Sequence, residues 1–175
     1  MSHENFTIAL AGNPNCGKTT LFNSLTGSRQ YVGNWPGVTV ETKEGYFVSN
    51  GEKIKIVDIP GIYSLSPYSM EEIVSKNYII EENPDVVVNI VDAANLERNL
   101  FLTLQLLSLR KPMIIALNMI DVAQKMGHEI NIRELEKKLG LRVIPIVASR
   151  NEGAEELVDA IRSEAGITRD TPVLE

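Results

Sequence analysis

Residues 12–19, which read GNPNCGKT, constrain the fold of this chain more than any other segment. They match the pattern GxxxxGKT, follow an apolar run at residues 6–11 and precede a helical pattern that begins at Lys18. A strand, a glycine-rich turn and a helix in this order form a phosphate-binding loop, because backbone N–H groups and the helix N-terminus converge on one point. We predict that Lys18 contacts the β- and γ-phosphates of a nucleotide and that the Thr19 hydroxyl binds Mg²⁺. The alternative is a plain turn that binds nothing, and the motifs downstream argue against it.

The composition is that of an ordinary soluble domain. The 175 residues are 43% hydrophobic and 23% charged, which suits one domain with a buried core. A net charge of −6 argues against a nucleic-acid partner. No run approaches the ~20 apolar residues of a membrane-spanning helix, and the single Cys16 cannot form an internal disulfide. We therefore expect a cytoplasmic protein, and His3 and His128 have no partners at the spacing of a transition-metal site.

Short runs rich in Val and Ile alternate with helical patterns, which predicts an α/β fold. We expect a mostly parallel six-stranded sheet with one antiparallel edge strand and helices on both faces. The Asn50-Gly51 pair between two β-type runs predicts a hairpin, whereas residues 28–37 lack periodicity and predict a mobile loop. The expected strands are residues 6–11, 38–48, 53–58, 85–92, 111–118 and 142–147. The expected helices are residues 18–25, 70–82, 96–110, 132–139 and 153–165.

Two details of the helices are also predicted. Asn131 and Glu134 resemble a capping box for the helix at residues 132–139. A stripe of leucines in the helix at residues 96–110 is expected to pack on the sheet rather than on a partner helix. These leucines are Leu96, Leu100, Leu104 and Leu107.

Two further motifs fall at expected strand ends, where ligands collect in open α/β sheets. In DIPG at residues 58–61, Asp58 would hold Mg²⁺ through water and the Gly61 N–H would meet the γ-phosphate. In NMID at residues 118–121, the Asp121 carboxylate can accept hydrogen bonds from guanine N1 and N2, a pair of donors that adenine lacks. Asn118 would tie this loop to the phosphate loop. Met119 replaces the usual lysine of NKxD, and its flexible chain can still cover the base.

The remaining signals are weaker when each is taken alone. Ala148-Ser149 follows the last expected strand, where a backbone N–H would meet guanine O6. Thr39 is placed to close on Mg²⁺ and the γ-phosphate through its hydroxyl and its N–H. Each motif has a plain structural alternative, such as a Pro-Gly turn, an Asn/Asp turn or a strand threonine. Their order along the chain nevertheless predicts a Ras-like P-loop GTPase fold that binds GTP or GDP.

With these residues placed, the chain closely resembles the N-terminal G domain of the ferrous-iron transport protein B family. The resemblance covers essentially all 175 residues and is carried by residues 12–23, 33–41, 58–66 and 85–100. One mild departure is Cys16, where Ser or Thr is commoner among relatives. The resemblance implies further nucleotide contacts at Asn13, Asn15, Cys16, Gly17, Thr20, Gly37 and Val38.

The same resemblance implies how this chain is used. Residues 1–175 would form a single G domain on the cytoplasmic face of the cell membrane. The helical domain and the Fe²⁺-conducting membrane domain of the family are absent from this chain, and the transport domain of the intact polypeptide would be its partner. Oligomers could form through the transporter.

Hydrolysis is expected to be slow. Ras-like enzymes place a glutamine just after DxxG, whereas Ile62 occupies that position here and cannot hydrogen-bond. The resemblance implies that Asn15 and backbone carbonyls near Gly33 and Trp35 hold K⁺, which would stabilise charge between the phosphates. Arg29 acting from the loop is the alternative device, and Asn15 could be a plain turn residue. The candidate catalytic residues are Lys18, Thr39 and Asn15.

The leading interpretation is a regulatory GTPase domain of a membrane ferrous-iron transporter. A cytosolic GTPase acting on tRNA or the ribosome is one alternative, which the acidic charge disfavours. A nucleotide-sensing switch with negligible catalysis is another, which Ile62 makes plausible.

Overall fold

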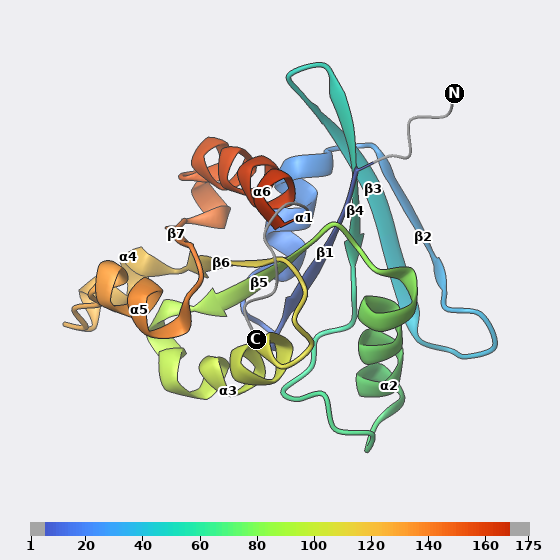
Figure 1. Cartoon of the computed structure of the whole chain (residues 1–175), viewed down its shortest axis with the longest axis horizontal. Helices are drawn as coiled ribbons and strands as arrows, with labels where there is room; N and C mark the ends of the chain where they lie inside the picture. Colours follow the sequence, from blue (N-terminus) through green and yellow to red (C-terminus); the bar gives the residue numbers. More distant parts are fainter. Residues whose placement is uncertain (1–5, 169–175) are drawn as a thin grey trace.

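A computed structural model describes residues 6–168 and shows a seven-stranded mixed sheet with helices on both faces (Figure 1). The strands are β1 (Phe6–Gly12), β2 (Gln30–Asn34), β3 (Glu41–Ser49), β4 (Glu52–Asp58), β5 (Val86–Asp92), β6 (Met113–Asn118) and β7 (Val143–Pro145). The α-helices are α1 (Lys18–Thr26), α2 (Met70–Asn77), α3 (Leu96–Leu107), α4 (Ile120–Lys125), α5 (Ile132–Leu139) and α6 (Ala154–Thr168). Shorter helical segments are η1 (Tyr78–Glu82), η2 (Ala93–Asn95) and η3 (Ala148–Arg150).

The sheet has the order β2-β3-β4-β1-β5-β6-β7, with β1 parallel to both of its neighbours. Strands β5, β6 and β7 continue the parallel part, so the loops after β1, β4, β5, β6 and β7 leave the same edge of the sheet. This arrangement confirms the predicted α/β fold and its mostly parallel sheet. It also brings every predicted motif that follows a parallel strand to one edge.

The two faces of the sheet bury different side chains. In β1, Ile8 and Leu10 point to the face covered by α1 and α6, while Ala9 and Ala11 point to the face covered by α2, η1 and α3. Successive strand residues alternate between faces, so a strand buried on both sides is apolar throughout. A third cluster beneath α4 and α5 contains Val91 of β5 together with Ile115 and Leu117 of β6.

The hairpin between β3 and β4 forms as predicted. Ser49 pairs with Glu52 across the turn, and Asn50 and Gly51 have φ values of 49° and 80°. Two consecutive positive φ values define the turn type that matches the twist of a hairpin, and Asn-Gly adopts it readily.

The prediction of six strands with the antiparallel strand at the edge was wrong, because part of the expected loop is strand β2, which lies outside the antiparallel strand β3. It pairs antiparallel with β3 from Gln30 opposite Gly45 to Asn34 opposite Glu41. Tyr31 and Val32 in this strand are exposed, so β2 buries little apolar surface and is held mainly by its backbone ladder. Its sequence therefore lacks the hydrophobic alternation that marks half-buried strands.

Helix α3 packs on the sheet as predicted, but the predicted leucines contribute only in part, since Leu96 and Leu107 are partly buried against the apolar clusters. Leu102 and Leu106 are buried together with Asn99 and Thr103, whereas Leu104 is 57% exposed. The polar side chains are accommodated because Thr103 Oγ1 donates to Asn89 Oδ1 of β5 at 2.5 Å. The fully buried face of the helix is thus shifted from the expected leucine stripe, of which Leu104 points to solvent.

The other predicted helices are present with small shifts at their ends, and the one at residues 70–82 comprises α2 and η1. Asn131 caps α5 as expected, since its Oδ1 accepts a hydrogen bond from the Glu134 N–H at 3.1 Å. Helix α4 was not predicted. Within residues 6–168, every helix is too short or too polar to cross a membrane.

Candidate nucleotide site

The phosphate loop connects β1 to α1 at the carboxyl edge of the sheet. Gly17 has a φ of 97° and immediately precedes α1, whose first turn contains no acidic side chain. A Cβ atom at Gly17 would lie 2.1 Å from Asn118 Nδ2, so glycine is required both for its conformation and for its size. The free N–H groups at the start of α1 consequently face the loop with no competing carboxylate.

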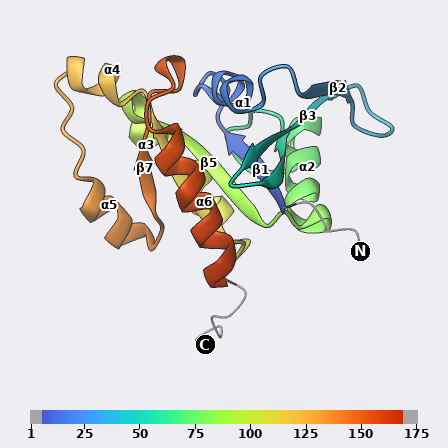
Figure 2. The same ribbon diagram turned by 90° about the horizontal axis from the view of Figure 1, so that it is seen from above.

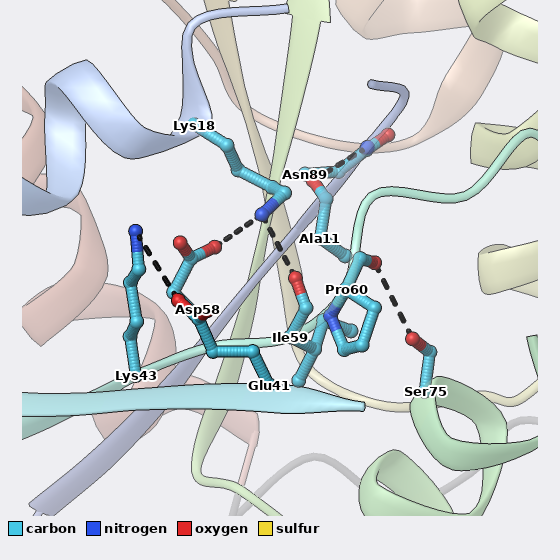
Figure 3. A network of polar contacts seen from close by, with 9 residues as sticks. All are labelled: Ala11, Lys18, Glu41, Lys43, Asp58, Ile59, Pro60, Ser75 and Asn89. Atoms are coloured by element: carbon cyan, nitrogen blue, oxygen red, sulfur yellow. Dashed lines mark hydrogen bonds and ion pairs between the residues drawn. The ribbon is translucent and has the colours of Figure 1, made fainter. Parts of the chain in front are cut away.

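Lys18 and Asp58 form a buried ion pair beside this loop (Figure 3). The Lys18 ammonium also donates to the Ile59 carbonyl oxygen at 2.8 Å. Lys18 begins α1 and Asp58 ends β4, and the parallel pairing of Leu10 with Asp58 brings these two ends together. Each buried charge therefore has a partner of opposite sign, and removing either partner alone would leave an uncompensated buried charge.

The DIPG loop lies directly against the phosphate loop. The Ile62 N–H donates to the Gly12 carbonyl at 3.1 Å, and a Cβ at Gly61 would lie 3.1 Å from Pro14 Cα. Ser75 of α2 donates to the Pro60 carbonyl at 3.3 Å and ties the loop to that helix (Figure 3). The Ile62 side chain is buried in the apolar cluster rather than turned toward the phosphate loop.

Asn118 joins three loops. Its Nδ2 donates to the Cys16 carbonyl at 3.0 Å, and its Oδ1 accepts from the Ala148 N–H at 3.0 Å. The residue is buried and ends β6, between the neighbouring strands β5 and β7. The phosphate loop, the NMID loop and the segment after β7 are therefore held at fixed separations.

The other end of the site is formed by α4 and η3. Met119 has a φ of 61° and precedes α4, which places Asp121 in the first turn of that helix. Arg150 of η3 lies close to Asp121, with Nη2 3.5 Å from Oδ2. Arg150 is not identifiable as a site residue from the sequence, because nothing in the local pattern indicates that η3 and α4 meet.

A hollow of about 500 Å³ opens between these loops. Its lining combines residues of the phosphate loop and α1 with one residue each from the DIPG and NMID motifs. The lining residues are Asn13, Pro14, Asn15, Gly17, Lys18, Thr19, Thr20, Gly61 and Met119. Cys16 lies beneath the loop, where burial raises the pKa of its thiol to about 11, so the thiol stays neutral near pH 7.

The loop between β2 and β3 is not part of this lining. It closes on itself, since the Trp35 N–H donates to the Val40 carbonyl at 2.9 Å and the Val38 N–H donates to the Trp35 carbonyl at 3.2 Å. Figures 1 and 2 show the loop projecting beyond the sheet edge, away from the start of α1. The structure therefore does not bring Thr39 and Gly37, both exposed, or the carbonyls of Gly33 and Trp35 to the phosphate loop.

Trp35 anchors this loop to the body of the domain. Its ring packs edge-on against Tyr78 of η1 with 5.3 Å between centroids. Among the residues that the structure describes, no acceptor lies within hydrogen-bonding distance of the buried Trp35 Nε1.

The donor set near Lys18 suits a hard cation. The Thr19 hydroxyl and the Asp58 carboxylate offer oxygen atoms, which Mg²⁺ prefers and which it commonly shares with phosphates. In the described part of the chain, no group of three or more His, Cys, Asp or Glu side chains is arranged to hold a metal ion.

Comparisons with known proteins agree on one family. The family described as "Ferrous iron transport protein B" matches residues 6–161. The chain is 55% identical over 159 residues to the Fe(2+) transporter FeoB of Escherichia coli (strain K12), a match that covers 89% of this chain and 21% of that protein. This chain thus spans about a fifth of the length of the curated relatives that it matches.

Solved structures are also similar over most of the chain. The FeoB G-domain from Methanococcus jannaschii is 49% identical with a TM-score of 0.82, and the match covers 93% of this chain and 98% of that one. The cytosolic domain of T. maritima FeoB in its GMPPNP form is 45% identical with a TM-score of 0.88, and the match covers 91% of this chain and 63% of that one.

Proposed function

The chain belongs to the ferrous iron transport protein B family, and we propose that it is the domain that binds GTP and GDP and hydrolyses GTP within a larger transporter. The observation that carries this proposal is the position of Asn118 between the Cys16 carbonyl and the Ala148 N–H. It holds the phosphate loop and the segment after β7 together at one edge of the sheet, which supports a ligand that contacts both, as a nucleotide would. The GMPPNP form of the similar T. maritima domain supports the same ligand class.

We assign the phosphate end to Lys18, Thr19, Thr20, Asp58 and Gly61. On binding, Lys18 would exchange Asp58 for the β- and γ-phosphate oxygens, and Asp58 would then face Mg²⁺ together with Thr19. Bound Mg²⁺ would neutralise charge on the phosphates. Gly61, which packs against Pro14, would offer its N–H to the γ-phosphate.

We assign the base end to Asp121, Met119 and Ser149. Because the Ala148 N–H already donates to Asn118, the Ser149 N–H is the donor we assign to guanine O6. Met119 would lie along the base. Its Cε is 3.8 Å from where a Cβ atom on Gly17 would lie, so its side chain reaches the phosphate loop. We also propose that the phosphates receive backbone contacts from the phosphate loop, at Asn13, Asn15, Cys16 and Gly17.

The base assignment is tested by exchanging Asp121 for Asn. Xanthine carries a carbonyl where guanine carries its 2-amino group, so an amide donor at this position should favour xanthine. Calorimetry with GDP, XDP and ADP, Mg²⁺ being present, should show GDP preferred by the unaltered protein and XDP preferred by Asp121→Asn. An unchanged guanine preference in the variant would contradict the assignment.

Hydrolysis should be slow and assisted by K⁺. Ile62 is buried and its side chain cannot orient water, so hydrolysis should be slow. Charge that develops between the phosphates needs a separate stabilising group. Asn15 lines the hollow and would hold K⁺. Movement of the β2–β3 loop would bring the carbonyls of Gly33 and Trp35 to the same ion. The same movement would let Thr39, with Gly37 and Val38, close on the phosphates. The alternative donor, Arg29, lies near the Tyr46 ring, with its guanidinium carbon 6.0 Å from the ring centroid, outside the residues lining this hollow.

The potassium proposal predicts faster GTP turnover in K⁺ than in Na⁺. Asn15→Ala should abolish that difference, whereas Arg29→Ala should preserve it. Equal rates in both salts would refute it. A nucleotide-sensing switch with negligible catalysis is the second candidate, favoured by the burial of Ile62, and single-turnover hydrolysis decides between the two.

The cellular setting is proposed from the family. The intact protein would place residues 1–175 as one G domain at the cytoplasmic face of the membrane, with the transport domain of the same polypeptide as partner and oligomers formed through the transporter. Family membership gives no support to a role on tRNA or the ribosome.

A further inference from the structure

Arg150 lies beside the carboxylate that we assign to base recognition, and no motif accounts for it. Its Nη2 is 3.5 Å from Asp121 Oδ2. We propose that Arg150 is a positioning residue, which orients the Asp121 carboxylate so that guanine is preferred over a purine lacking the 2-amino group. This inference rests on the proposed function.

The backbone that carries Arg150 is fixed. The Val147 and Glu152 N–H groups each donate to the other residue's carbonyl at 3.1 Å, which closes a short loop around η3. The Arg150 N–H donates to the Val147 carbonyl at 3.1 Å. From α1, Ser24 Oγ donates to Asn151 Oδ1 at 2.7 Å. The side chain therefore starts from a position that varies little.

Two acidic groups lie beside the guanidinium group of Arg150, whose side chain is 57% exposed. Glu152 Oε1 lies 3.3 Å from Arg150 Nε, and Asp121 lies on the Nη2 side. A guanidinium group is planar with its donors in a fixed fork, so a contact at Nε constrains where Nη2 points. Glu152 thus helps to direct Arg150 toward Asp121.

The geometry leaves Asp121 free to bind a base. The Nη2–Oδ2 separation of 3.5 Å exceeds the roughly 2.7–3.2 Å of a good N–H···O hydrogen bond, so the attraction is mainly ionic. A carboxylate has about four acceptor positions, and guanine needs only two of them. The Asp121 side chain is 28% exposed, and without a neighbouring cation its rotation would be less restricted.

Arg150 also supplies a positive charge that the NMID sequence lacks. The common NKxD form has a lysine where Met119 stands, and a methionine carries no charge. In this chain the cation at the base end comes from the segment after β7 instead. Its effect should fall on Asp121, and therefore on the 2-amino group that distinguishes guanine from hypoxanthine.

The test measures affinities for GDP and for inosine diphosphate (IDP), which lacks the 2-amino group. Arg150→Ala should reduce the IDP-to-GDP ratio of dissociation constants about two- to fivefold, the range expected for a partly exposed ion pair. GDP binding should weaken more than IDP binding, because IDP keeps the N1–H contact with Asp121 but has no 2-amino group to lose. Arg150→Lys should restore part of the ratio.

Two further variants make the result specific. Arg162→Ala, which breaks an ion pair with Glu52 at 3.2 Å far from the site, should leave the ratio unchanged. In an Asp121→Asn background, Arg150→Ala should no longer alter the ratio. Equal weakening of GDP and IDP, or an unaltered ratio, would overturn the role of Arg150. Failure of the unaltered protein to bind GDP would instead refute the proposed function itself.

Discussion

The ammonium group of Lys18 and the carboxylate of Asp58 compensate each other's charge, with only 10% and 6% of the two side chains exposed. They come from the helix after β1 and from the end of β4, so the pair couples the phosphate loop to the DIPG loop. A ligand that draws Lys18 away must offer another partner to Asp58. Binding of a nucleotide with Mg²⁺ meets that condition, because the metal can replace the ammonium group beside the carboxylate.

Lys18→Met should lower the free energy of unfolding by about 3–5 kcal/mol, since it leaves the Asp58 charge buried without its partner. Urea denaturation of the nucleotide-free protein measures this loss. The double variant Lys18→Met/Asp58→Asn should recover much of the stability but no GDP affinity. Equal stability of the single variant and the unaltered protein would contradict the importance of the ion pair.

Asn118→Ala should weaken both stability and GDP affinity. It removes the partner of the Cys16 carbonyl and of the Ala148 N–H, and each buried group left unsatisfied costs about 1–3 kcal/mol. Ser24→Ala, which removes only an exposed hydrogen bond to Asn151, is the control and should change stability little. Denaturation and calorimetry on both variants provide the measurement, and similar losses in the two would argue against a special role for Asn118.

Gly17→Ala should abolish nucleotide binding, whereas Gly27→Ala should not. Both glycines have positive φ values, 97° and 58°, so both substitutions introduce backbone strain of about 1–3 kcal/mol. At Gly17 the added methyl group would also collide with Asn118. At Gly27 there is no such collision, because no atom lies within 4 Å of the place that a Cβ would take. Titration with GDP separates the two effects, and comparable affinities would show that the contact with Asn118 is dispensable.

Trp35 should report movement of the β2–β3 loop. It is the only tryptophan in the sequence, and its ring now packs on Tyr78 with a buried N–H. If Thr39 closes on a γ-phosphate, Trp35 must leave this apolar site, and its emission should shift to longer wavelength. Fluorescence with Mg²⁺-GMPPNP should show the shift and Mg²⁺-GDP a smaller one. Identical spectra in both states would mean that the loop stays docked.

Alkaline pH should destabilise the fold through Cys16. Burial raises the pKa of its thiol from 9.0 to about 11, so the folded protein keeps a proton that the unfolded chain releases. The free energy of unfolding should therefore be unaffected below pH 9 and fall by up to about 3 kcal/mol between pH 9 and 11. Cys16→Ser should reduce the fall without removing it, because burial also raises the pKa of Tyr78, with a smaller contribution from the nearby charges of Glu44 and Glu82. A stability profile identical in the two proteins would contradict the assignment to Cys16.

Sequence reasoning located the parts of this domain whose signals are local. The GxxxxGKT loop, the Asn50-Gly51 turn and the Asn131 cap depend on neighbouring residues and were found. Strand β2 was missed because it forms only by pairing with β3. The buried face of α3 was predicted only in part, because the burial of Thr103 depends on a hydrogen bond to Asn89. Arg150 could not be predicted for the same reason, since its partner Asp121 is distant in the chain.

The position of β2 at the margin of the sheet has a consequence for regulation. Its five residues pair with β3 alone, so they can detach without breaking any other strand pairing. Such a segment can unfold locally while the rest of the domain keeps its full protection against hydrogen exchange. Rearrangement of the loop that follows β2 is therefore thermodynamically separable from global unfolding. A change in the conformation of this segment can carry a signal with little effect on the lifetime of the folded domain.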